Sequence, residues 1–102
     1  MSEMNSLRPS VIAAIANLFT LYERETITTM LIEECTAEKL YSSSAEGVER
    51  IQLAVLKLSQ GNADKFLAAI ELAHLDWRDV LVAAGFGIDL RAHLKWAEEI
   101  IE

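Results

Sequence analysis

LDWRDVLVAAGFG, residues 75–87, is the stretch that decides the class of fold. Asp76 has the side chain that caps a helix N-terminus, and Asp79 three residues later favours the positive end of the helix dipole. Gly85 follows the last apolar position, where a left-handed residue commonly ends a helix. The stretch therefore predicts a short helix between a cap and a glycine stop. Its expected buried residues are Trp77, Val80, Leu81 and Ala84.

The Gly-x-Gly at residues 85–87 also has to be compared with a phosphate-binding loop. A dinucleotide-binding loop follows a strand and has the longer pattern Gly-x-Gly-x-x-Gly. Here a helical pattern precedes Gly85, and Gly87 is followed by IDL. We therefore interpret the glycines as a helix stop and a hinge, after which Asp89 caps the last helix.

Apolar residues recur at helical spacing on both sides of this stretch. Downstream, the apolar side of the final helix consists of Leu90, Leu94, Trp96, Ala97, Ile100 and Ile101. Upstream, Asn62 is the expected cap of another helix. The inner stripe of that helix consists of Phe66, Ala69, Ile70 and Ala73.

The N-terminal part of the chain predicts further helices. Pro9 suits the first turn of a helix, Ser6 is its expected cap, and residues 1–6 are expected to fray. The apolar positions of this helix are Val11, Ile12, Ile15, Leu18, Phe19 and Tyr22. Residues 25–41 contain the strand-like run TITTMLI, but no second run of this kind exists to pair with it. We therefore expect a helix that continues or restarts after Arg24.

Residues 41–59 predict a break followed by a helix with two apolar sides. Ser43 and Glu46 have the spacing of a capping box, and Gly61 is expected to end the helix. One apolar seam consists of Val48, Ile51, Val55 and Leu58, and the opposite side contains Leu53 and Leu56. A helix of this kind is either central in its own fold or shared with a partner chain.

Together these patterns predict an all-α fold, a compact bundle of five or six short helices with short connections, formed by one domain over residues 1–102. The stretches DWRDVLVAAGFG and AHLKWAE also resemble the C-terminal half of small bacterial proteins that are uncharacterised. The resemblance implies a compact helical fold. It brings no catalytic motif and transfers no site residues.

The net charge of −7 is concentrated in residues 23–49, where seven acids face two bases. This distribution predicts an acidic face that can attract a basic protein partner. The same sign repels phosphate, so we expect no binding to nucleic acid. Apolar residues make up 52% of the chain, a surplus that favours a homodimer.

Cysteine content and hydropathy indicate the compartment. Cys35 is the single cysteine, so no intrachain disulfide can form, and a reducing cytoplasm fits best. We expect Cys35 to pack as a small hydrophobe. No segment approaches the roughly 20 apolar residues that span a bilayer, so no membrane contact is expected.

Four residues are candidates for chemistry. Glu34 and Glu38 lie four apart on one face of a predicted helix, where they can bind a metal ion, form an acid–base pair or make a salt bridge across an interface, unless both are solvated at an edge. Glu71 and His74 have the Glu-x-x-His spacing of carboxylate-bridged metal bundles, although a helix-end histidine more often bonds a carbonyl. His93 lies in an apolar stripe and is expected to be structural, with both ring nitrogens satisfied.

Two functions are consistent with these observations. The favoured one is a non-catalytic helical protein-interaction module that homodimerises, presents an acidic face and uses no cofactor. The alternative is a small helical metal-binding protein or enzyme that uses Glu34 and Glu38, or Glu71 and His74.

Overall fold

Side-chain caps define where three helices begin. Asn62 Oδ1 accepts a hydrogen bond from the backbone N–H three residues later at 2.9 Å, and Asp76 Oδ1 accepts one from two residues later at 3.0 Å. The Ser44 hydroxyl accepts one from three residues later at 2.9 Å. Each bond satisfies a donor that the first helical turn leaves unpaired. The predicted caps Asn62 and Asp76 are confirmed, whereas the cap expected at Ser43, which lies outside the described residues, is Ser44.

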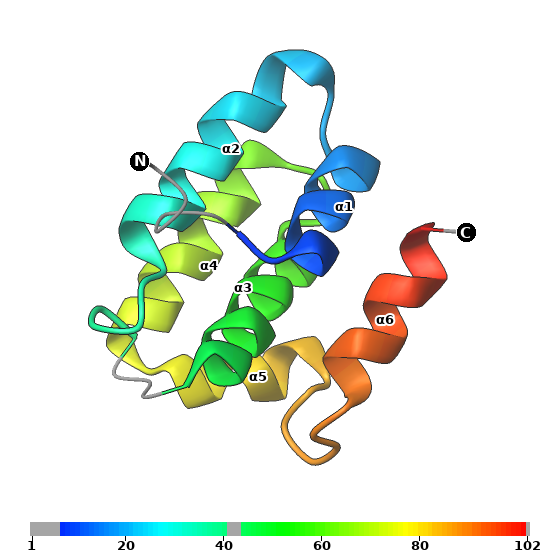
Figure 1. Ribbon diagram of the computed structural model, residues 1–102. Helices are drawn as coiled ribbons and strands as arrows, with labels where there is room; N and C mark the ends of the chain where they lie inside the picture. The colour runs from blue at the N-terminus through cyan, green and yellow to red at the C-terminus, as the bar shows by residue number, and fades with distance from the viewer. Residues whose placement is uncertain (1–6, 41–43, 102) are drawn as a thin grey trace.

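The computed structural model describes residues 7–40 and 44–101 (Figure 1). The helices are α1 (Pro9–Leu18), α2 (Leu21–Glu34), α3 (Ala45–Ser59), α4 (Ala63–Leu75), α5 (Trp77–Ala84) and α6 (Ala92–Ile101). The prediction of an all-α bundle is confirmed, because these ranges contain six helices and no strand. None of these helices has the length and apolar character needed to cross a membrane. Residues 1–6, which we expected to fray, and the predicted cap Ser6 lie outside the described ranges.

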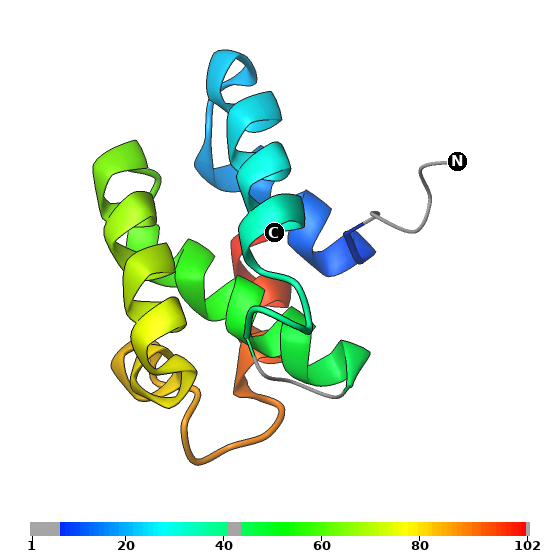
Figure 2. The same ribbon diagram turned by 90° about the vertical axis from the view of Figure 1, so that its left-hand side faces the viewer.

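Helix α3 runs through the middle of the molecule (Figure 2). It packs against α1, α4, α5 and α6, while α2 packs against α1 and α4. Six consecutive residues of α3 are buried, the polar Gln52 and the apolar Ile51, Leu53, Ala54, Val55 and Leu56. Most of both apolar sides is therefore covered by the chain itself, and the helix is central in its own fold.

The boundary between α1 and α2 differs from the prediction. We expected the first helix to reach Tyr22 and a helix to continue or restart after Arg24, but α1 ends at Leu18 and α2 begins at Leu21. The Thr20 N–H donates to the Glu23 carboxylate at 3.4 Å in a capping box. The run TITTMLI therefore lies within a helix.

Arg24 strengthens this corner between α1 and α2. Its guanidinium donates from Nε to the Phe19 carbonyl at 3.0 Å and from Nη2 to the Ala16 carbonyl at 2.9 Å. These bonds satisfy carbonyls that the end of α1 leaves unpaired. Tyr22, which we placed in the buried stripe, is 96% exposed because the helix break turns it outward.

The final helix begins later than predicted. Helix α6 starts at Ala92, so Leu90 lies in the preceding turn and is exposed instead of joining the apolar stripe. Asp89 accepts a hydrogen bond from the Arg91 N–H at 2.8 Å and so caps the turn that leads into α6. Within α6, Ala97 is buried, and Leu94, Trp96 and Ile100 are partly buried. In α5, Trp77 is partly buried, while Val80, Leu81 and Ala84 are buried as predicted.

Two glycines with positive φ allow a test of how tightly the corners pack. Gly61 has φ of 76°, and a Cβ there would lie 2.7 Å from the Leu18 carbonyl oxygen. Gly85 has φ of 82°, but among the described residues a Cβ there would meet only Lys57 Nζ at 3.7 Å.

We expect Gly85→Ala to lower the free energy of unfolding by about 1–2 kcal/mol through backbone strain alone. Gly61→Ala should cost about 3 kcal/mol or more, because the backbone clash adds to that strain.

Urea unfolding of both variants measures the difference. Equal losses for the two substitutions would contradict the close approach of Gly61 to the end of α1.

Candidate functional site

Glu34 and Glu38 do not share a helix face. Helix α2 ends at Glu34, and Cys35 follows as its C-cap with its N–H donating to the Leu31 carbonyl at 3.0 Å. Glu38 lies in the turn beyond, where it is exposed, while the Glu34 side chain is 36% exposed. The prediction of one continuous helical stripe through Glu38 is wrong, because the chain turns after Cys35. Tyr41, the last residue of the range 25–41 that we expected to be helical, lies outside the described residues.

His74 meets Glu34 instead. Its Nε2 donates to the Glu34 backbone carbonyl at 2.8 Å, which requires the hydrogen of the ring to sit on Nε2, because a carbonyl can only accept. The Glu34 carboxylate lies 3.9 Å from the same nitrogen and 3.3 Å from Lys39 Nζ. The expectation that a helix-end histidine bonds a carbonyl is confirmed. Glu71 is exposed one turn earlier on α4.

The arrangement around Glu34 and His74 offers few ligands for a metal ion. Within residues 7–40 and 44–101, no group of three or more His, Cys, Asp and Glu side chains could hold a metal ion. Structural zinc sites use four protein ligands and catalytic ones three. Here one carboxylate and one imidazole are available, and the ammonium of Lys39 already occupies one carboxylate oxygen.

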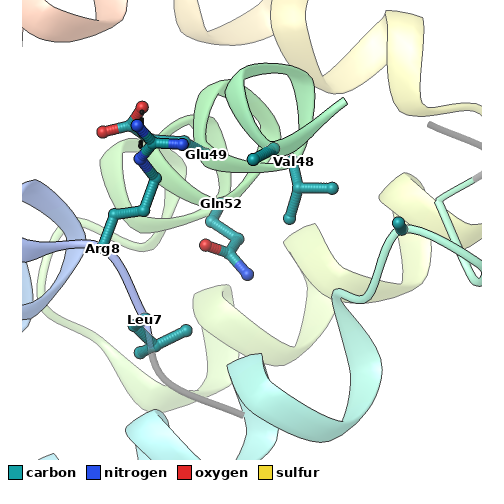
Figure 3. Close-up of a pocket in the computed structure, with 7 residues that line it drawn as sticks. Leu7, Arg8, Val48, Glu49 and Gln52 are labelled. Atoms are coloured by element: carbon teal, nitrogen blue, oxygen red, sulfur yellow. Dashed lines mark ion pairs between the residues drawn. The ribbon is translucent and has the colours of Figure 1, made fainter. Parts of the chain in front are cut away.

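A second polar cluster joins the start of α1 to α3 (Figure 3). Glu49 of α3 is only 7% exposed. Its carboxylate lies 3.4 Å from Arg8 Nε and accepts a hydrogen bond from the Ser10 hydroxyl. Beside it is a hollow of about 210 Å³, whose lining residues are Leu7, Arg8, Ala37, Ala45, Val48, Glu49 and Gln52. Glu49 therefore belongs to an internal ion pair and does not contribute to the acidic face expected over residues 23–49.

Gln52 and Cys35 continue the internal contacts of α3. Gln52 Nε2 donates to the Cys35 carbonyl at 3.0 Å and so ties α3 to the end of α2. The Cys35 side chain is buried as predicted, and burial raises the pKa of its thiol to about 12, with the Glu34 charge adding to the effect. A thiol with this pKa remains protonated at neutral pH and is a poor nucleophile.

Sequence reasoning counted Glu49 among the acids of residues 23–49 and assigned no role to Gln52. The signal that could have located them is their position on the same side as Leu53 and Leu56, which indicated burial. The partners could not be read from the sequence, because Ser10 and Cys35 lie 39 and 17 residues away.

His93 is buried, but the expectation that both its ring nitrogens are satisfied is wrong. Nδ1 is buried and has no hydrogen-bond partner among the described residues. The ring lies 6.2 Å from the Phe86 ring, centroid to centroid. Burial lowers the pKa of His93 below its ordinary value of 6.5.

The last turn of α5 and the connection to α6 form an exposed apolar corner, consisting of Val82, Ile88 and Leu90. Their exposed fractions are 69%, 99% and 71%. Val82 and Ile88 line a hollow of about 230 Å³ together with Gly85 and Gly87. The apolar corner therefore contains a shallow hollow next to Gly85, the residue that ends α5.

Comparison of the chain with protein-family models, curated proteins and solved structures finds no match.

The Arg8–Glu49 pair predicts unequal effects of removing either partner. The Arg8 side chain is 45% exposed, whereas that of Glu49 is 9% exposed. Arg8→Met leaves a buried carboxylate with Ser10, so we expect a loss of roughly 2–3 kcal/mol in the free energy of unfolding. Glu49→Gln leaves a guanidinium that water can reach, and we expect a loss of about 1 kcal/mol.

Chemical denaturation at pH 7 measures both losses. Glu34→Gln and Glu38→Gln are the matched controls and should each change stability by less than about 0.5 kcal/mol, as solvated side chains do. A larger loss for Glu49→Gln than for Arg8→Met would contradict the assignment of Glu49 as the buried partner.

Proposed function

We propose that this protein is a non-catalytic helical protein-interaction module of the cytoplasm, which homodimerises through the apolar corner and presents an acidic face to a basic partner. The observation that carries the proposal is the grouping of exposed Val82, Ile88 and Leu90 around one connection. Leaving such side chains in water costs about 25 cal/mol for each Å² of apolar surface, and contiguous exposed patches mark interaction sites.

The apolar corner, and not α3, is the surface that is free for dimerisation. The two apolar sides of the helix at residues 46–59 were consistent with a dimer, but most of both sides is covered within the chain. The apolar corner remains exposed, with Ile88 at 99%. We therefore propose the apolar corner as the dimer surface.

The charge distribution favours contact at this corner. Residues 23–49 have seven acids and two bases, whereas residues 50–95 have five acids and six bases. Two copies that meet at the apolar corner repel each other less than two that meet at α2. Asp89 and Arg91 flank the corner with opposite signs, so that a two-fold axis can bring them together across the interface.

The acidic face lies on α2 and the two segments that follow it. Its exposed carboxylates are those of Glu25, Glu33, Glu38 and Glu46. These groups complement a lysine- or arginine-rich protein surface and repel the phosphates of nucleic acid.

A metal-binding function is the second candidate, and the 3.9 Å approach of His74 to Glu34 is the observation that favours it. The pair joins one residue from each of the two motifs seen in the sequence. A complete site needs further ligands from a second copy or from water.

The dimer proposal predicts a mass that depends on one exposed side chain. Native mass spectrometry and light scattering at micromolar concentration should give about 23 kDa, twice the 11.4 kDa of the chain. Ile88→Lys should return the protein to the single-chain mass with unchanged stability, because Ile88 is almost fully exposed. The matched control is Leu75→Lys, since Leu75 is also exposed, at 85%, but lies outside the apolar corner.

A single-chain mass for the unchanged protein across a wide dilution series would refute the dimer. A dimer that persists in Ile88→Lys and dissociates in Leu75→Lys would refute its location.

The metal alternative predicts binding that depends on Glu34 and His74 together. We expect no stoichiometric uptake of zinc, manganese or iron(II) at equimolar metal, measured by calorimetry and native mass spectrometry. Tight uptake that disappears in the Glu34→Gln/His74→Gln double variant would favour the alternative. The Glu71→Gln variant is the control, because Glu71 shares the helix of His74 and lies on its surface.

A further inference from the structure

The burial of His93 is the feature of this fold that the proposed function does not use. His93 is 5% exposed and lies in α6, which packs on α1 and α3 at the side of the molecule away from α2 and α4 (Figure 1). Its Nδ1 is buried without a hydrogen-bond partner within the described residues. A buried polar nitrogen in this state loses its hydration without gaining a hydrogen bond that would compensate for the loss.

The charged groups around His93 do not favour a proton on its ring. On α3, the Arg50 guanidinium opposes a positive charge, while the Glu49 carboxylate favours one. Glu49 is already engaged by Arg8 and Ser10 of the α1 segment. Protonating His93 therefore adds a charge to a buried space that contains an arginine and a neutralised carboxylate.

The turn before α6 adds two more charges, which also oppose each other. Arg91 disfavours a charged His93, and Asp89 favours it but pairs with Lys95 at 3.4 Å. No carboxylate that His93 could reach is thus without a basic partner among the described residues. Burial outweighs these charges and is the first cause of the lowered pKa of His93.

We propose that protonation of His93 releases α6 from α1 and α3, so that the docking of this helix is a pH-sensitive contact. A charged imidazole can reach water only if α6 moves outward. Helix α6 is at the end of the described chain and is held by Ala97 and partly buried side chains, whereas α3, α4 and α5 pack on one another without it. Local opening of a peripheral helix requires less free energy than unfolding of the whole core.

The direction of the pH effect follows from proton linkage. Because the pKa of His93 is lower in the docked state than its ordinary value of 6.5, the released state binds the proton more tightly. The docking free energy is complete above about pH 6.5 and decreases as the pH falls toward the pKa of the docked state. A pH range from 7.5 to 5.0 extends to both sides of the ordinary histidine value of 6.5, and most carboxylates remain ionised over it.

Trp96 provides the signal for the experiment. It lies on α6, and its ring is 6.2 Å from that of Phe86. The Trp77→Phe background leaves Trp96 as the only tryptophan, since the chain has two. We expect its emission maximum to move to longer wavelength between pH 7.5 and 5.0, reversibly and independently of protein concentration. We also expect hydrogen exchange in α6, corrected for the intrinsic effect of pH, to rise at least tenfold relative to α3.

Two substitutions assign the transition to one residue. The chain has two histidines, so His74→Gln is the matched control and should keep the full transition. His93→Leu should abolish it and keep α6 protected at pH 5.0, because an apolar side chain at that position has no proton to bind. If His93→Leu does not fold, His93→Gln and an NMR titration of the His93 ring replace it.

The proposal is overturned if the emission of Trp96 stays constant over this pH range in the unchanged sequence. It is equally overturned if the transition survives removal of His93, or if NMR shows the His93 ring titrating with α6 still protected. Because the readout is the same at all protein concentrations, it decides the proposal whether or not the protein dimerises.

Discussion

The burial of residues 51–56 in the middle of α3 is the constraint on which the other elements depend. A helix that its neighbours cover over this length has few directions for its polar side chains, and those of α3 reach to the backbone and side chains of the surrounding segments. The contacts are Glu49 with Arg8 and Ser10, Arg50 with the Phe86 carbonyl, Gln52 with the Cys35 carbonyl, and Lys57 with the Ala84 carbonyl. Each of them fixes a chain end or a connection, where the backbone lacks helical partners. The central helix therefore positions the periphery through hydrogen bonds as well as through apolar packing.

The parts of the fold that were predictable from the sequence are those decided within one turn of helix. Asn62, Asp76 and Gly85 acted as expected, because a cap or a left-handed stop depends on residues two to four positions away. The capping box at Thr20 was missed, since apolar residues continue across it and conceal the break. The end of α2 at Glu34 has no glycine or proline to announce it.

The candidate site was harder to predict from the sequence than the fold, for a physical reason. The sequence paired Glu34 with Glu38 and Glu71 with His74, because it shows only neighbours along the chain. The structure joins Glu34 to His74, which are 40 residues apart, through a backbone carbonyl that no side-chain pattern encodes. In the same way, the burial of His93 was visible in its apolar stripe, whereas its unpaired nitrogen depends on what α1 and α3 place beside it.

The close approach of Gly61 to the Leu18 carbonyl has a consequence for anyone who wishes to alter the chain. The α3–α4 turn rests directly on the end of α1, so an insertion there would lift two corners of the bundle apart. The connection from Gly85 to Arg91 instead lies mostly at the surface, with Phe86 as its buried anchor. An insertion beyond Gly87 would therefore disturb the packing of the bundle less than one at Gly61, because the backbone there is exposed, but it would separate Ile88 and Leu90 from the rest of the apolar corner.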